Sequence, residues 1–161
     1  MKLFKKSKLA VASAINKYLK SELVKIKWPN DLLIDGKKLA GILSEKCVAG
    51  VVVGVGINIY QTQDELPITN AIALSMISPV NRDELLIEIL NQLGSAFSDI
   101  ENQKNLYREK CATVGTRIGA TLPDGEIIED LAIGISNDGA LLLNSREIRV
   151  GDIVHLRYAS D

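Results

Sequence analysis

Side chains that build metal sites are scarce in this sequence, which has 2 cysteines and 1 histidine among its 161 residues. Cys47 and Cys111 form neither a CxxC pair nor a zinc-ligand spacing, and a structural zinc site needs about four such ligands. Two isolated thiols are typical of a reducing compartment. We therefore expect a cytoplasmic protein without a structural zinc site.

Long apolar runs are missing as well. No run reaches the roughly 18 residues of a membrane span. The basic start of the chain leads into an amphipathic stretch with Asn16 and Lys17, so it lacks the apolar core of a signal peptide. The sequence therefore predicts neither a membrane span nor a secretion signal.

Charge is divided unevenly along the chain. Residues 1–46 carry 11 lysines and 4 acidic residues, a net charge of +7, whereas residues 47–161 carry a net charge of −8. The overall charge of −1 argues against a nucleic-acid binder. A positive segment on a negative body can attract an anion such as a nucleotide, although a solvated, lysine-rich helix face would produce the same pattern.

Hydrophobic periodicity predicts the order of the elements in the first two thirds of the chain. A helix is expected over 8–20 and strands over 23–28, 32–34 and 38–43, with Asp35-Gly36 as a two-residue hairpin turn. The apolar run over 51–59 is predicted to be a buried central strand. After a loop over 60–80, helices are expected over 82–98 and 100–112. The first of these two helices should pack through one face, formed by Leu85, Leu86, Ile89, Leu90, Leu93 and Phe97.

The pattern changes near Val114. From there to Tyr158, short apolar strands alternate with turn signals around Gly125, Gly139 and Gly151. Five short strands in about 45 residues are typical of a small β-barrel. The sequence therefore predicts an α+β fold in which a mixed β-sheet carries helices on one face, in a domain over 1–112, followed by a small barrel over 113–161.

An unusual block, Lys27-Trp-Pro-Asn-Asp31, lies where Pro29 interrupts two strands. The interruption lets Asn30 and Asp31 turn toward a cleft, where Asp31 can hold Asn30, the loop backbone or a metal-bound water. Lys38, on the following strand, can reach a carboxylate or phosphate as a point charge. An ordinary turn would also explain the Pro-Asn-Asp sequence, and a surface position would also explain Lys38.

Two glycines interrupt the apolar run over 51–59. Glycine inside a strand costs stability, because it has no side chain to pack and more backbone entropy to lose. Gly54 and Gly56 share one face of this strand, so a flat ligand can lie directly on the backbone there. Asn58 lies on the same face and can hydrogen-bond in two directions. A β-bulge or close strand–helix packing is the alternative explanation.

The single histidine offers no catalytic triad. His155 falls in the last strand of the predicted barrel, where a packed or edge-strand role is expected. Asp138 and Asp152 lie in predicted turns, where aspartate is common for local reasons.

Three motifs follow one another in order: Lys27-Trp-Pro-Asn-Asp31, Lys38-Leu-Ala-Gly41 after a gap of six residues, and Gly54-Val-Gly-Ile-Asn58. Together they resemble the catalytic domain of the biotin protein ligase (biotin–[acetyl-CoA-carboxylase] ligase) family. The stretch Gly134–Leu143 resembles the C-terminal SH3-like barrel of the same family. The chain is thus similar to the later part of that catalytic domain plus the barrel.

The resemblance implies an activity. Biotin and ATP would give biotinyl-5′-AMP and pyrophosphate, and the adenylate would then acylate a lysine of a biotin carboxyl carrier protein. Mg²⁺ would be held mainly by the phosphates, without a protein cage. The catalytic residue would be Lys38, in contact with the biotin carboxyl group and the α-phosphate. The substrate- and nucleotide-binding residues would be Lys27, Asn30, Asp31, Gly41, Ile42, Gly54, Gly56 and Asn58.

Individual roles follow from the same resemblance. Gly41 and Ile42 would line the biotin pocket. Asn30 and Asn58 would lie near the nucleotide and its metal ion. Gly54 would let the ligand approach the strand, and Asp31 would orient the loop.

The printed sequence also departs from the family. The Gly-Arg-Gly-Arg-type loop that closes over the adenylate has no counterpart, and the first arginine is Arg82. The N-terminal winged helix of repressor-type members also has no counterpart in this sequence, so DNA binding is not expected. Three interpretations stay open: a ligase that acts alone or with a separately encoded N-terminal half, a non-catalytic remnant that binds biotin, adenylate or carrier protein, and a lipoate-type ligase. An open sheet edge would favour a homodimer.

Overall fold

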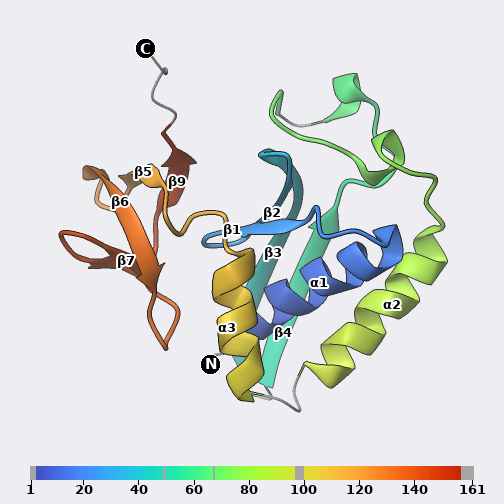
Figure 1. Cartoon of the computed structure of the whole chain (residues 1–161), viewed down its shortest axis with the longest axis horizontal. Helices are drawn as coiled ribbons and strands as arrows, with labels where there is room; N and C mark the ends of the chain where they lie inside the picture. Colours follow the sequence, from blue (N-terminus) through green and yellow to red (C-terminus); the bar gives the residue numbers. More distant parts are fainter. Residues whose placement is uncertain (1–2, 49, 67, 97–99, 157–161) are drawn as a thin grey trace.

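The computed structural model describes residues 3–48, 50–66, 68–96 and 100–156. These residues form a four-stranded sheet with helices beside it and a separate five-stranded sheet, which lies on the left in Figure 1. The predicted α+β class is confirmed. The C-terminal unit is a five-stranded sheet, and its closure into the predicted SH3-like barrel stays a prediction. No helix in these ranges is long and apolar enough to cross a membrane.

Consecutive hairpins build the first sheet. Its strands, in spatial order, are β1 (Lys25–Lys27), β2 (Asp31–Ile34), β3 (Lys37–Cys47) and β4 (Gly50–Ile57). Asp35 and Gly36 join β2 to β3 with φ values of 50° and 75°, as a type I′ turn requires, so the predicted hairpin is confirmed. The sheet is less mixed than predicted. Its ladders are antiparallel, and within the part of the chain that the structure describes parallel pairing is limited to isolated bridges such as Lys38–Ala71.

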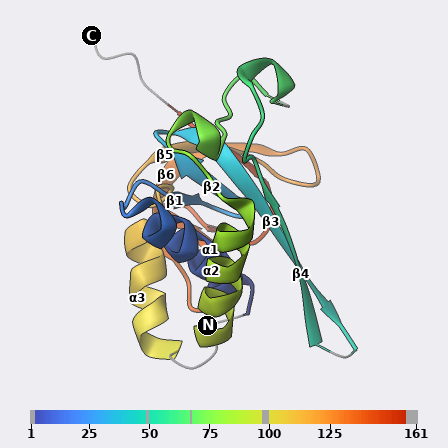
Figure 2. The ribbon, with the colours of Figure 1, turned by 90° about the vertical axis from the view of Figure 1, so that its right-hand side faces the viewer.

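Three helices lie on one side of this sheet (Figure 2): α1 (Leu3–Leu19), α2 (Arg82–Ser95) and α3 (Ile100–Lys110). The first helix lies against β1 and β3, and its Val11, Ala12 and Ile15 are fully buried. The second helix packs on α1 rather than on the sheet, so a narrow stripe, Leu85 and Ile89, is buried. The wider predicted face was wrong in two places. Leu86 and Leu90 are more than half exposed, and Phe97 lies outside the described residues.

The apolar strand β4 is not central, as its composition predicted, but the last strand of the described sheet. Val53 and Ile57 pack on the core, whereas Val52 and Gly54 are exposed. The strand is apolar throughout because one of its faces lies under the helices and the other carries valine and glycine in the open. Figure 2 shows the β3–β4 hairpin extending past the helices.

The second sheet contributes buried residues to the same hydrophobic core as the first. Its strands are β5 (Arg117–Thr121), β6 (Ile127–Ile135), β7 (Leu141–Leu143), β8 (Glu147–Ile148) and β9 (Asp152–His155), in the order β8-β7-β6-β5-β9. Ile118, Ala132 and Leu141 are fully buried. The predicted domain boundary at 112/113 falls between α3 and β5 and stays a prediction.

Asn16 joins the end of α1 to the start of β1, and its side chain is buried. Its Oδ1 accepts a hydrogen bond from the backbone N–H of Val24 at 2.8 Å, and its Nδ2 donates to the carbonyl oxygen of Val24 at 3.3 Å. A second donation from Nδ2 reaches Oε2 of Glu22 at 3.2 Å. This amide therefore satisfies a buried stretch of backbone that no helix or ladder serves.

We expect Asn16→Ala to lower the free energy of unfolding by about 1–3 kcal/mol, because it leaves the Val24 backbone groups buried without partners. Urea unfolding measures the loss. Asn91→Ala, on the exposed face of α2, is the matched control and should change stability by less than about 0.5 kcal/mol. Equal losses in the two variants would contradict this role of Asn16.

Candidate functional site

A pocket of about 550 Å³ opens on the face of the first sheet that the helices leave uncovered. This volume lies within the range of small-molecule sites, roughly 300–1,000 Å³. The pocket combines an ammonium group, a carboxylate, an amide and a glycine-rich floor. Its lining residues are Asn30, Asp31, Lys38, Gly41, Ile42, Leu43, Gly54, Val55 and Gly56.

Lys38 and Asp31 form an ion pair inside this pocket. The Nζ of Lys38 lies 2.8 Å from Oδ1 of Asp31, and the two side chains are 40% and 23% exposed. Asp31 begins β2 directly opposite Gly41 on β3, and a Cβ added at Gly41 would lie 3.9 Å from both Oδ1 of Asp31 and Cε of Lys38. The ammonium is thus held at the pocket by its partner while part of it remains open to an anionic ligand.

The glycines of the pocket lie on both strands of the β3–β4 ladder. Gly41 pairs with Gly56, and Gly54 pairs with Leu43. A Cβ added at Gly54 would meet no atom within 4 Å, and one at Gly56 would come within 4.0 Å of the Gly41 carbonyl oxygen alone. The ladder runs through these residues without a register shift. Neither a bulge nor close packing therefore requires Gly54, and its absent side chain leaves backbone open to the pocket.

Asn30 and Ile42 connect the pocket to the backbone of the sheet. The carbonyl oxygen of Asn30 accepts a hydrogen bond from the Ile42 N–H at 2.8 Å, which fixes the loop beside β3. The side chain of Ile42 is fully buried in the core. Since neighbouring strand residues point to opposite faces, Ile42 borders the pocket through its backbone.

Two predicted site residues lie beside the pocket rather than in its lining. Asn58 donates from Nδ2 to the carbonyl oxygens of Lys38, at 3.4 Å, and of Ile72, at 3.2 Å. It therefore supports the strand that carries Lys38. Lys27 pairs with Asp31 across the β1–β2 hairpin. The sequence thus predicted a residue set that the structure largely brings together, with these two at its margin.

The segment around Ala71 is the part of the site that the sequence did not predict. The backbone N–H of Lys38 donates to the carbonyl oxygen of Asn70 at 2.9 Å, and the N–H of Ile72 donates to the Lys38 carbonyl oxygen at 2.9 Å. No periodic pattern signals this pairing, because the segment belongs to a loop. Leu43 could have been found, since strand alternation places it on the same face as Gly41.

Within the described residues, no group of three or more His, Cys, Asp or Glu side chains could hold a metal ion. Cys111 is buried beside Trp28 and Thr113, and burial raises the pKa of its thiol. A buried neutral thiol is a poor nucleophile and a poor metal ligand. The chemistry of the site therefore rests on Lys38, Asp31 and the exposed backbone.

A model of the Biotin/lipoate A/B protein ligase family matches residues 4–59, a stretch that contains every residue lining the pocket. The chain belongs to the biotin/lipoate protein ligase family. The biotin–[acetyl-CoA-carboxylase] ligase of Mycobacterium tuberculosis is 34% identical to this ligase-family chain over 142 residues, which are 82% of the chain and 53% of that protein.

Solved structures agree on the fold. The apo structure of biotin protein ligase from Aquifex aeolicus has a TM-score of 0.81 at 24% identity, and the match covers 96% of this chain and 75% of that one. The same ligase in complex with biotin and ATP has a TM-score of 0.79 at 24% identity, with 97% and 71% covered. The chain spans about half the length of the curated ligases it matches.

We expect Gly54→Val to leave this ligase-family chain folded, with an unfolding free energy within about 1 kcal/mol of the original, because the new side chain meets open space and valine favours strands. Gly151→Val is the contrasting variant. A Cβ there would lie 3.1 Å from the Thr121 carbonyl oxygen, so stability should fall. Urea unfolding compares the two, and a severe loss in Gly54→Val would show that the fold itself requires this glycine.

Proposed function

We propose that this chain carries the adenylate site of a biotin protein ligase, which makes biotinyl-5′-AMP from biotin and ATP and transfers biotin to a lysine of a biotin carboxyl carrier protein. The observation that supports this most is the shared pocket. The Lys38 ammonium and the glycine face of Gly41, Gly54 and Gly56 line one cavity in a chain whose relatives are named biotin ligases.

In the first proposed step, a biotin carboxylate oxygen attacks the α-phosphorus of ATP, and the bond to pyrophosphate breaks. Negative charge grows on the phosphate oxygens in the transition state. A fixed cation at that position stabilises the charge without rearranging at the moment of reaction. Lys38 would supply it, and the 2.8 Å ion pair with Asp31 would keep its amine at the pocket.

In the second proposed step, the amine of a carrier lysine attacks the acyl carbon, AMP leaves and the amine loses a proton. The glycine face would hold the adenylate by close backbone contact, which fixes the acyl carbon for attack. Asn30 would orient the ligand from the loop end of the pocket. The pocket residues would therefore bind and position the reactants in both proposed steps.

Mg²⁺ is compatible with the site, because Asn30 and Asp31 offer oxygen ligands at the pocket. The ion binds oxygen and is usually held by one or two carboxylates together with substrate phosphates. Bound there, it would neutralise phosphate charge. Asp31 would then serve both the ion and Lys38.

The partner proposed is the carrier domain, and no DNA partner is proposed. We retain a cytoplasmic location, the domain boundary at 112/113, and a homodimer or a separate N-terminal half as predictions. The exposed edge of β4 favours pairing with another polypeptide, since an unpaired strand edge presents free backbone groups.

We expect Lys38→Ala to weaken binding of a stable biotinyl-5′-adenylate analogue about ten- to a hundredfold, because a charge-assisted contact worth roughly 1.5–3 kcal/mol is lost. Calorimetric titration measures the affinity. Lys37→Ala is the matched control, since Lys37 is an exposed neighbour on the same strand that does not line the pocket. Similar losses in both variants would remove Lys38 from the site.

Biotin-dependent exchange of pyrophosphate into ATP tests the proposed reaction on the original chain. Exchange with biotin would support the ligase, and exchange with lipoate instead would favour the lipoate branch of the family. Analogue binding without exchange would replace the ligase with the non-catalytic binding module.

Gly54→Val should bind the biotinyl-5′-adenylate analogue at least tenfold more weakly while remaining folded. Unchanged affinity in the same titration would show that the ligand does not lie on β4.

A further inference from the structure

The loop that carries Asn30 into the pocket is anchored at its other end by the C-terminal β unit. The side chain of Trp28 is only 3% exposed. Its indole Nε1–H donates to the carbonyl oxygen of Gly139 at 2.9 Å, and its backbone N–H donates to Oγ1 of Thr113 at 3.0 Å. Both bonds join the β1–β2 loop to residues beyond α3.

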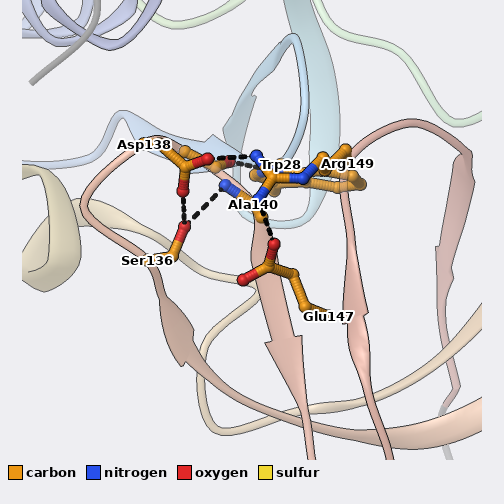
Figure 3. A network of polar contacts seen from close by, with 7 residues as sticks. Trp28, Ser136, Asp138, Ala140, Glu147 and Arg149 are labelled. Carbon is orange, nitrogen blue, oxygen red and sulfur yellow. Dashed lines mark hydrogen bonds and ion pairs between the residues drawn. The ribbon is translucent and has the colours of Figure 1, made fainter.

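The turn that offers the Gly139 carbonyl is braced by a polar network (Figure 3). The Ser136 hydroxyl bonds to the Asp138 carboxylate and also accepts the N–H of Ala140, at 3.0 Å for the latter. Arg149, which directly follows β8, forms an ion pair with Asp138. Its guanidinium and the Ser136 hydroxyl hold the pKa of Asp138 well below its usual range, so the carboxylate stays ionised at neutral pH. The turn that presents the acceptor for the indole is therefore held by contacts of Ser136, Asp138 and Arg149.

Thr113, which accepts the hydrogen bond from the Trp28 backbone, also has little room to move. Thr113 is fully buried, and its Oγ1 also lies 3.1 Å from Nε2 of His155 on β9. Trp28 is thus held at two places beyond α3, by the β6–β7 turn and by Thr113, which precedes β5 and contacts His155 on β9. A shift of that unit would move both anchors together.

On the pocket side, Trp28 is followed at once by the ligand-facing residues. Pro29 alone separates it from Asn30, whose carbonyl oxygen holds the Ile42 N–H at 2.8 Å. Asn30 also lines a second cavity, of about 550 Å³, together with Trp28 and Gly139. The loop therefore forms a wall shared by the pocket and the junction.

We propose that Trp28 is a positioning residue, whose indole N–H lets the C-terminal β unit set the place of Asn30 and Asp31 in the adenylate pocket. The inference rests on the proposed function for its ligand and on the hydrogen bonds above for its mechanism. Another bond across the same junction serves as a reference. Nη2 of Arg108 donates to the Ile135 carbonyl oxygen at 3.2 Å and does not touch the loop.

The first test compares Trp28→Phe with Arg108→Met by calorimetric titration of the biotinyl-5′-adenylate analogue, below the unfolding temperature of both. Each variant loses one donor across the junction, so both can lose stability. Only Trp28→Phe should lose affinity, by about tenfold, with Arg108→Met within twofold of the original chain. Equal affinities, or equal losses, would overturn the inference.

A second variant separates the N–H from ring volume. Because Trp28 is the single tryptophan of the chain, a tryptophan auxotroph can replace it with β-(3-benzothienyl)alanine, in which sulfur stands in place of the N–H. This variant should bind the analogue as weakly as Trp28→Phe. Affinity equal to that of the original chain would show that the ring shape acts and the hydrogen bond does not.

A third readout needs no ligand and so keeps the inference distinct from the proposed function. Hydrogen exchange at the Ile42 amide reports the bond to Asn30, and it should be at least fivefold faster in Trp28→Phe while unchanged in Arg108→Met. If the original chain failed to bind the analogue, the proposed function would fall, and this exchange rate would still decide whether Trp28 positions the loop. Equal rates in all three proteins would exclude that role.

Discussion

A sheet covered by helices on one side must divide its residues between a dry face and an open face. Here α1 supplies the cover, and strand alternation assigns Ile42, Val53 and Ile57 to the dry side. The remaining positions of β3 and β4 are left without a cover. Glycines occupy three of them, Gly41, Gly54 and Gly56, so the open face is backbone rather than side chain. The site depends on this division, since the cavity lies where no helix covers the sheet and where glycines place no side chain on it.

The charge pattern acquires a physical meaning on this scaffold. The lysine-rich first part of the chain was open to two explanations, a solvated helix face and an anion site. The structure separates the lysines to which the two explanations apply. Lys17 is exposed and pairs with Glu88 on α2 at 2.9 Å, whereas Lys38 pairs with Asp31 beside the glycine face. A count of lysines could not separate these roles, because the separation depends on which side of the sheet each residue occupies.

Local patterns in the sequence predicted much of the fold and of the candidate site. The Asp35-Gly36 turn follows from backbone sterics and fixes how β2 meets β3 next to the turn. A register shift between Leu32 and Leu33, which the sequence did not predict, then brings Asp31 opposite Gly41. The failures share a different cause. The edge position of β4 and the pairing of Lys38 with Ala71 depend on packing between segments far apart in sequence. The hydrogen bond between Trp28 and Gly139 joins residues 111 positions apart, and neither residue type indicates its partner in the sequence.

The solitary tryptophan has a practical consequence of its own. Indole emission depends on the polarity and rigidity of its surroundings, and in this chain all of it comes from the wall between two cavities. Ultraviolet fluorescence of the unlabelled protein is therefore a spectroscopic signal from a single known place. Any change in colour or intensity can be assigned to that junction without a dye, a tag or a competing chromophore of the same kind.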